Sequence, residues 1–160
     1  MQPPKNLLNF NVLILTLVFT MGTTTAHPID DYFKKHKNDH EMESKIVPPK
    51  IASQVVDKDY PEAIAILKSM SALRYLNYYG DLNQIKKYAK QALAAKGSYP
   101  LLLEKKEENR NIKVFGIKKN GLVRRLFAVV QSKTQFLLII GKGKLSNTQV
   151  QYLPILAKEL

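Results

Sequence analysis

Three histidines come closest, in residue type and spacing, to a metal site: His27, His36 and His40. His36 and His40 are four residues apart, so their imidazoles can share one face of a helix and bind Zn²⁺ or Cu²⁺. If cleavage makes His27 the first residue, its amine and imidazole can chelate copper, with His36 or His40 as the third nitrogen. The spacing is not that of an HExxH motif, and charged neighbours favour solvated histidines. A metal-binding protein or metalloenzyme using these three residues is therefore one alternative.

Other catalytic motifs are weak or missing from the sequence. All three histidines precede residue 41, and no GxSxG motif is present. The absence of cysteine excludes thiol catalysis, disulfides and Cys-ligated metal. Glu104, Glu107 and Glu108 form an acidic cluster between lysines, which is typical of a solvated hairpin tip. We therefore assign no catalytic residue and no cofactor, and a non-enzymatic protein is favoured.

Basic residues supply the second set of candidate binding groups. The formal net charge is +12, and it is lopsided: residues 27–62 hold eight acids and six Lys/Arg, whereas residues 63–160 hold five acids and 18 Lys/Arg. This bias suits an anionic lipid, glycan or nucleic acid partner, although lysines on the solvent side of strands explain it equally well. The sequence from Gly141 to Lys144 precedes a capped helix and could hold an anion. The candidate anion- or partner-binding residues are Lys113, Lys118, Lys119, Arg124, Arg125, Lys142 and Lys144.

The N-terminal residues predict export. Lys5 is followed by a mostly apolar run over residues 7–21 and by small residues over 22–26, so we expect cleavage between Ala26 and His27. The run is short of the roughly 20 apolar residues of a spanning helix. We therefore expect a signal peptide over residues 1–26, one α+β domain over residues 27–160, and a periplasmic or extracellular protein that is not integral to the membrane. Export also argues against a nucleic acid partner.

Apolar spacing and capping residues predict the helices. Asp81 with Gln84, and Ser146 with Gln149, have the spacing of capping boxes, and Pro154 should kink the last helix. Residues 37–44 are polar and are interpreted as a loop, while residues 51–56 fit a short helix or a strand. The expected helices cover residues 29–36, 61–70, 81–96 and a segment that begins after Ser146.

Strand and turn signals predict an antiparallel meander. Asn120-Gly121 is a strong hairpin signal, because both turn positions need a positive φ. Neither face of residues 122–130 or 136–140 is cleanly polar, so we expect the second face of the sheet to be partly covered, by the N-terminal segment or by another molecule. The fold class is α+β, with four to five strands and helices packed mainly on one face. The expected strands cover residues 74–79, 99–105, 112–118, 122–130 and 136–140.

Several of these segments, taken in order, resemble a known family. They are a Lys-Ser-Met-Ser-Ala-Leu-Arg-Tyr-Leu segment (68–76), Gly-Ser-Tyr-Pro-Leu-Leu (97–102) and the strand-rich stretch over 112–145. The chain resembles domain of unknown function family 4252, small exported proteins of Bacteroidota, over most of the mature chain and most strongly after Met70. The resemblance implies an exported α+β domain and brings no catalytic residue. A Pro-rich stretch over residues 41–56 departs from the family pattern.

Together these patterns predict an exported cell-envelope protein that serves as a binding or accessory domain with a basic sheet surface. Its partner would be a protein, a lipid or a glycan of the envelope. The metal hypothesis is one alternative, and an envelope stress or signalling component without a small ligand is another.

Overall fold

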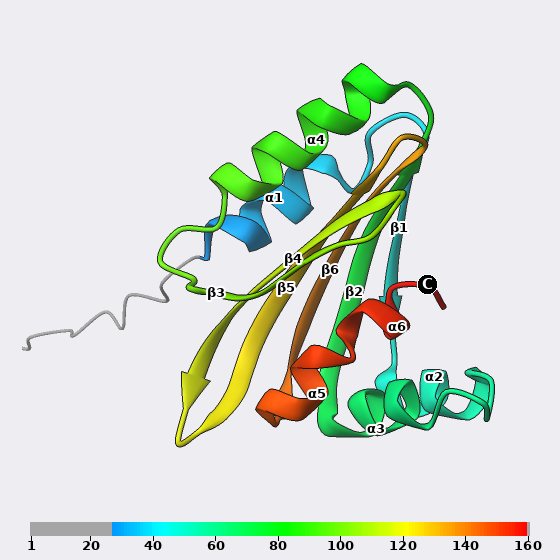
Figure 1. Cartoon of the computed structure of the whole chain (residues 1–160). Helices are drawn as coiled ribbons and strands as arrows, with labels where there is room; N and C mark the ends of the chain where they lie inside the picture. The colour runs from blue at the N-terminus through cyan, green and yellow to red at the C-terminus, as the bar shows by residue number, and fades with distance from the viewer. Residues whose placement is uncertain (1–26, 160) are drawn as a thin grey trace, which may run out of the picture.

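A computed structural model describes residues 27–159, so the expected signal peptide lies outside the described residues. The chain forms one open antiparallel sheet of six strands in the order β1-β2-β6-β5-β4-β3 (Figure 1). The expected α+β class is confirmed, but the sheet has six strands rather than four to five. The strands are β1 (Met42–Val47), β2 (Met70–Tyr79), β3 (Leu101–Lys106), β4 (Arg110–Lys119), β5 (Leu122–Ser132) and β6 (Gln135–Leu145).

Helices cover both faces of this sheet. On one face lie α1 (Pro28–His36) and α4 (Leu82–Ala94), and on the other lie the remaining four helices (Figure 1). The prediction that helices pack mainly on one face is therefore wrong. The reason is that the central strands are apolar on both faces, so both faces must be buried. The four helices of the second face are α2 (Pro49–Val55), α3 (Pro61–Ser69), α5 (Asn147–Gln151) and α6 (Leu153–Leu156).

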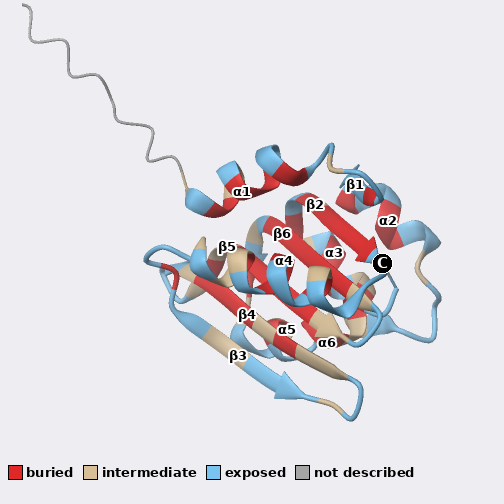
Figure 2. Ribbon diagram, turned by 90° about the horizontal axis from the view of Figure 1, so that it is seen from above, coloured by how far each residue is buried: buried red, intermediate tan, exposed pale blue. Residues whose placement is uncertain are grey.

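The two faces have different cores. Under α1 and α4 the core is rich in aromatic rings: Tyr88 packs on Phe136, and Phe115 stacks on Phe127 with ring centroids 5.0 Å apart. Under the other four helices it is almost entirely aliphatic, and its large fully buried side chains include Leu126. Burial is concentrated in the four middle strands, whereas β3 at the edge is largely exposed (Figure 2). The middle of the sheet is thus the buried central layer of the fold, and exposed side chains lie at its ends and edges.

The local signals of the sequence fix several element boundaries. The β4–β5 turn has φ of 54° at Asn120 and 74° at Gly121, as its hairpin signal predicts. Asp81 accepts hydrogen bonds from two backbone N–H groups at the start of α4, and Ser146 forms a complete capping box for α5. The last helical segment breaks at Tyr152, and Pro154 lies in the first turn of α6, as expected from its missing N–H.

One N-terminal segment differs from the prediction, and a second segment, for which helix and strand were both left open, is a helix. Part of the expected loop is strand β1, whose Met42 pairs with Tyr78 of β2. This edge strand is mostly exposed and lacks the alternation that marks a buried strand. The ambiguous segment that follows is helix α2. Both β1 and α2 lie in the Pro-rich stretch over residues 41–56.

Candidate anion-binding site

Irregular strand pairing is concentrated at the end of the sheet next to the β4–β5 turn. In β2, Ser71 is an extra residue between two consecutive pairs of β6, and in β5, Arg124 is an extra residue between two consecutive pairs of β4. In β6, Gly143 and Lys144 together face the single residue Arg124. Because bulges re-aim side chains and twist strands, three neighbouring strands present irregular positions to one small region.

A hollow of about 400 Å³ lies in that region, and we call it the bulge pocket. Its side chains come from the α3–β2 junction and from the bulged parts of β5 and β6. The lining contains hydroxyl and cationic groups but no carboxylate. The residues that line the bulge pocket are Ser69, Met70, Ser71, Arg124, Lys142, Gly143 and Lys144.

Gly143 lets the α3–β2 junction approach the floor of the bulge pocket. A Cβ atom at this position would lie 2.4 Å from the carbonyl oxygen of Ser69 and 2.8 Å from Cα of Met70. Both contacts are with backbone, which cannot rotate away as a side chain can. The glycine is therefore a packing requirement of the pocket.

The four arginines of the chain separate into two classes. Arg74, Arg110 and Arg125 each form an ion pair with a carboxylate. Arg124 instead makes one long hydrogen bond, 3.5 Å from its Nε to the carbonyl oxygen of Lys119. Within residues 27–159, Arg124 is thus the only arginine without a carboxylate partner. Its remaining guanidinium N–H groups are available to an external anion.

Arg125, one of the predicted binding residues, has its side-chain partners inside the fold. Its Nη2 lies 2.7 Å from a carboxylate oxygen of Asp30 in α1, and its Nε lies 2.9 Å from the hydroxyl oxygen of Tyr99. Burial lowers the pKa of Arg125, but Tyr99 and Asp30 raise it by more. Arg74 binds the other oxygen of Asp30 and lies over the ring of Phe33. These contacts fasten α1 to β2 and β5.

The other predicted basic residues also differ in their surroundings. Lys113 faces Glu104 across the β3–β4 pair, with 3.5 Å between Nζ and the carboxylate. Lys118 and Lys119 are exposed at the end of β4, just before the turn, and Lys142 and Lys144 are exposed on β6. No carboxylate lies within ion-pair distance of these last four lysines in the part of the chain that the structure describes. The structure therefore places Arg124, Lys142 and Lys144 in the lining of one hollow and leaves Lys113 elsewhere. Arg125 faces Lys142 across the β5–β6 pair, but its guanidinium is bound by Asp30 and Tyr99.

The three histidines are not brought together. His27 precedes α1 and packs edge-on to Tyr99, while His36 ends that helix, so about 13 Å of helical rise separates them. The Nδ1 atom of His36 is 2.6 Å from the Asp39 carboxylate, and His40 is almost fully exposed. Among residues 27–159, no group of three or more His, Asp or Glu side chains could hold a metal ion.

Asp39 gives His36 a structural role that the sequence did not predict. The carboxylate accepts hydrogen bonds from His36 and from the Tyr88 hydroxyl, the latter at 3.1 Å. Burial raises the pKa of Asp39, but these hydrogen bonds lower it by more, so that pKa lies below its usual range. The cluster connects the end of α1 to α4.

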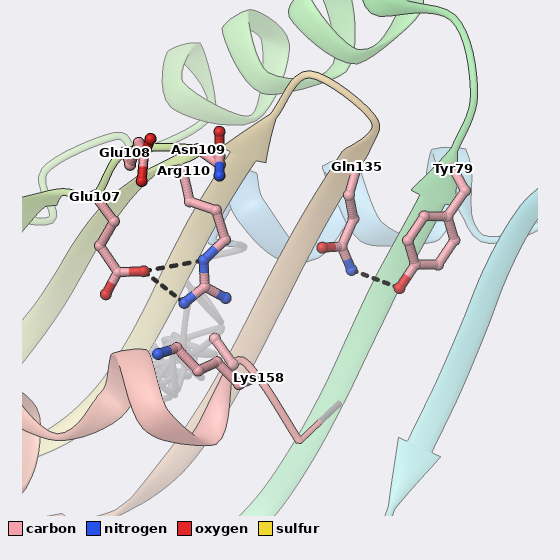
Figure 3. A pocket seen from close by; sticks show the side chains of 8 residues that line it. Tyr79, Glu107, Glu108, Asn109, Arg110, Gln135 and Lys158 are labelled. Carbon is pink, nitrogen blue, oxygen red and sulfur yellow. Dashed lines mark hydrogen bonds and ion pairs between the residues drawn. The ribbon is translucent and has the colours of Figure 1, made fainter.

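A second hollow, of about 480 Å³, lies at the opposite end of the sheet beside the acidic β3–β4 turn. Figure 3 shows that the Arg110 guanidinium points at the Glu107 carboxylate through two nitrogens, at 3.1 and 2.7 Å. Hydrogen bonds from Arg110 and from Lys105 lower the pKa of Glu107. On the far side of the hollow, Gln135 donates to the Tyr79 hydroxyl. The arginine of this hollow is thus bound to a carboxylate, in contrast to Arg124 of the bulge pocket.

Sequence reasoning missed the two serines of the bulge pocket. The Ser69 hydroxyl donates to the carbonyl oxygen of Ala65 and accepts from Gln149, which leaves it occupied. The Ser71 hydroxyl makes only a 3.4 Å hydrogen bond, to the carbonyl oxygen of Lys142. No local signal in the sequence marks Ser71, because its position depends on a bulge between strands about 70 residues apart in the chain.

Comparison with known proteins gives a family but no function. No curated protein and no solved structure matches the chain. None of the helices in residues 27–159 has the length and apolar character needed to cross a membrane. The family described as "Domain of unknown function (DUF4252)" matches residues 36–153, which include every strand, four of the six described helices in whole, and one end residue each of α1 and α6. On the strength of that match, this chain belongs to the DUF4252 family.

Proposed function

We propose that this protein is a non-enzymatic, exported domain of the cell envelope that binds an anionic partner at the bulge pocket. The observation that carries the proposal is the convergence of Arg124, Lys142 and Lys144 on one hollow that no carboxylate lines. Elsewhere in the described chain, arginine charges are matched by an acid. Like charges that share a hollow repel one another, and an anion that enters the hollow relieves that repulsion.

The chemistry of the bulge pocket is recognition. A guanidinium offers planar paired donors to a phosphate, sulfate or carboxylate, and two ammonium groups add charge without fixed geometry. Ser71 adds a hydroxyl beside them. Beside these donors, the lining residues include no imidazole or carboxylate that could serve as a general base. The pocket therefore suits an anion that is held rather than transformed.

Short-chain inorganic polyphosphate is a suitable probe for isothermal titration calorimetry. We expect saturable binding that weakens as salt rises, because exposed charges are screened over about 8–10 Å. The double variant R124Q/K142Q should bind at least about tenfold more weakly. The matched control is K87Q/K90Q on α4, which removes two exposed charges far from the pocket. Equal affinities for the parent protein and R124Q/K142Q would contradict the proposal.

Export is tested separately by the mass of the protein recovered from its own cells. Cleavage after Ala26 predicts a chain that begins at His27 and is found outside the cytoplasm. An intact chain that keeps Met1 and stays in the cytoplasmic fraction would refute this part of the proposal without touching the binding site.

A further inference from the structure

We infer that the anionic partner is the surface of a phospholipid bilayer, which this protein meets with one end of the sheet: α2, the α3–β2 junction and the bulge pocket. The inference rests on the proposed function and names the partner of the same site. It draws on a second observation that anion binding does not require, an exposed aliphatic pair on α2.

The aliphatic pair consists of Ile51 and Val55, one helical turn apart. Ile51 is 59% exposed and Val55 is 78% exposed, whereas Ala52 and Ser53 of the same helix are buried against the fold. Residues four apart on a helix lie on the same side, so the two side chains form one protruding ridge. Other aliphatic side chains are exposed among the described residues, such as Ile46 and Leu101 on the edge strands, but Ile51 and Val55 lie together on one helix.

The helix that carries the ridge is linked to the bulge pocket by another hollow. A hollow of about 610 Å³ beside α2 is lined by Lys50, Gln54, Lys68 and Met70, among others. Met70 also lines the bulge pocket, so the two hollows adjoin at the α3–β2 junction. In Figure 1, α2, α3 and the β4–β5 turn all lie at the same end of the sheet.

The charge of this end is strongly positive. Eight basic side chains belong to it, and none has a carboxylate within ion-pair distance among the described residues. The acids of this end, Asp57, Asp59 and Glu62, are confined to the α2–α3 connection and the start of α3. The eight basic residues are Lys50, Lys58, Lys68, Lys118, Lys119, Arg124, Lys142 and Lys144.

An anionic bilayer can bind both the basic side chains and the aliphatic pair of this end. Its headgroups attract basic side chains, and its acyl boundary receives aliphatic groups that protrude by about one side chain. Lysines beside the ridge can extend their ammonium groups to the phosphates while their alkyl stems stay near the apolar layer. A soluble glycan offers the charge but no apolar phase for Ile51 and Val55. The combination therefore favours a lipid surface over a glycan.

The test is co-sedimentation with vesicles of phosphatidylcholine alone or mixed with phosphatidylglycerol. The chain from His27 is used, because it carries every described element and both cores, and because the apolar run over residues 7–21 would bind lipid by itself. We expect binding only to the mixed vesicles. R124Q/K142Q should lower the partition coefficient about 30-fold, and I51S/V55S should lower it by at least about tenfold.

Two matched controls are available on α4, at the other end of the sheet. K87Q/K90Q removes two exposed charges, and L82S removes a partly exposed aliphatic side chain. Both should bind mixed vesicles as the parent protein does. Circular dichroism of every variant confirms that the fold is kept, since all the substituted side chains are at least partly exposed.

Titration with polyphosphate separates the two proposals. If the inference is right, I51S/V55S keeps its affinity for polyphosphate and loses its affinity for mixed vesicles. If the parent protein binds polyphosphate but not the mixed vesicles, or if I51S/V55S binds those vesicles normally, the lipid inference is overturned while the anion site stands. If the parent binds neither probe, both proposals fail.

Discussion

Arg124 and Arg125 are neighbours in the sequence, yet they belong to different regions of the molecule. Arg125 points to the α1 face, where Asp30 and Tyr99 bind it. Arg124 occupies a bulge at the end of the sheet and has only a long hydrogen bond to a carbonyl oxygen. The first region uses its charges to hold the fold together, and in the second Arg124 has no carboxylate partner among the described residues. A basic residue is therefore a binding candidate only once its internal acid partners are known.

Among the substitutions that test this contrast, Asp30→Ala should have the largest effect on the free energy of unfolding. The substitution leaves Arg74 and Arg125 without their shared carboxylate in a half-buried position. The free energy of unfolding should fall by about 2–4 kcal/mol, measured by urea denaturation. The control is Asp31→Ala at the next, exposed position of α1, with a change within about 0.5 kcal/mol. Similar denaturation midpoints for the two variants would show that the Asp30 contacts do not fasten α1.

Gly143→Ala tests the close packing of the bulge pocket. The added Cβ meets the backbone of Ser69 and Met70, so the junction must move. The free energy of unfolding should fall by about 1–3 kcal/mol, and polyphosphate binding should weaken with it.

Gly121→Ala is the matched control for Gly143→Ala. Gly121 has a positive φ but no atom within 4 Å of an added Cβ, so only backbone strain of about 1 kcal/mol is expected. The Gly121→Ala variant should bind polyphosphate with the affinity of the parent protein. A larger loss of stability in Gly121→Ala than in Gly143→Ala would contradict the packing argument.

Asp39→Asn tests a second paired cluster, and its effect depends on pH. The pKa of Asp39 is lowered in the folded state, so the carboxylate contributes stability above its unfolded pKa of about 3.9 and loses it as pH falls further. At neutral pH the variant should be less stable by about 0.5–1 kcal/mol. Thermal denaturation from pH 7 to pH 3 should show this difference shrinking below about pH 4. A difference that is constant over the whole range would rule out the charged form as its source.

Arg124→Gln should have the smallest effect on stability. Its guanidinium has no carboxylate partner, so the free energy of unfolding should change by less than about 0.5 kcal/mol. Binding to mixed vesicles should nevertheless fall about fivefold. Arg125→Gln should do the reverse, lowering stability while the charge of the bulge pocket stays intact. If Arg124→Gln lowers the free energy of unfolding as much as Arg125→Gln does, the two arginines do not differ in their contribution to stability, and the contrast is wrong.

Local signals predicted the local structure well. The Asn120-Gly121 turn, the cap at Asp81, the capping box at Ser146 and the break near Pro154 each depend on residues close together in the chain. The edge strand β1 was missed because its exposed side chains show no period, and the pairing with β2 that defines it is about 30 residues away.

The candidate site was only partly predictable. Composition and position marked Arg124, Lys142 and Lys144 as candidate binding residues of the strands, but they marked Arg125 and Lys113 equally. What separates them is pairing with Asp30 and Glu104, which lie in other elements. Ser71 depends on a bulge that no local pattern encodes. The apolar character of both faces of β5 and β6 did predict that the second face is covered, by the N-terminal segment or by another molecule. The cover is instead α2, α3, α5 and α6, and the N-terminal helix α1 packs on the opposite face.

The most direct measurement of the contrast is an NMR titration of the four arginine Nε–H signals with inorganic polyphosphate. Four arginines give four signals, which single Arg→Lys variants assign. We predict that the Arg124 signal shifts with saturation, while those of Arg74, Arg110 and Arg125 stay in place because carboxylates hold them. Equal shifts of all four signals, or a shift of Arg125 without Arg124, would contradict the division between structural and available charge.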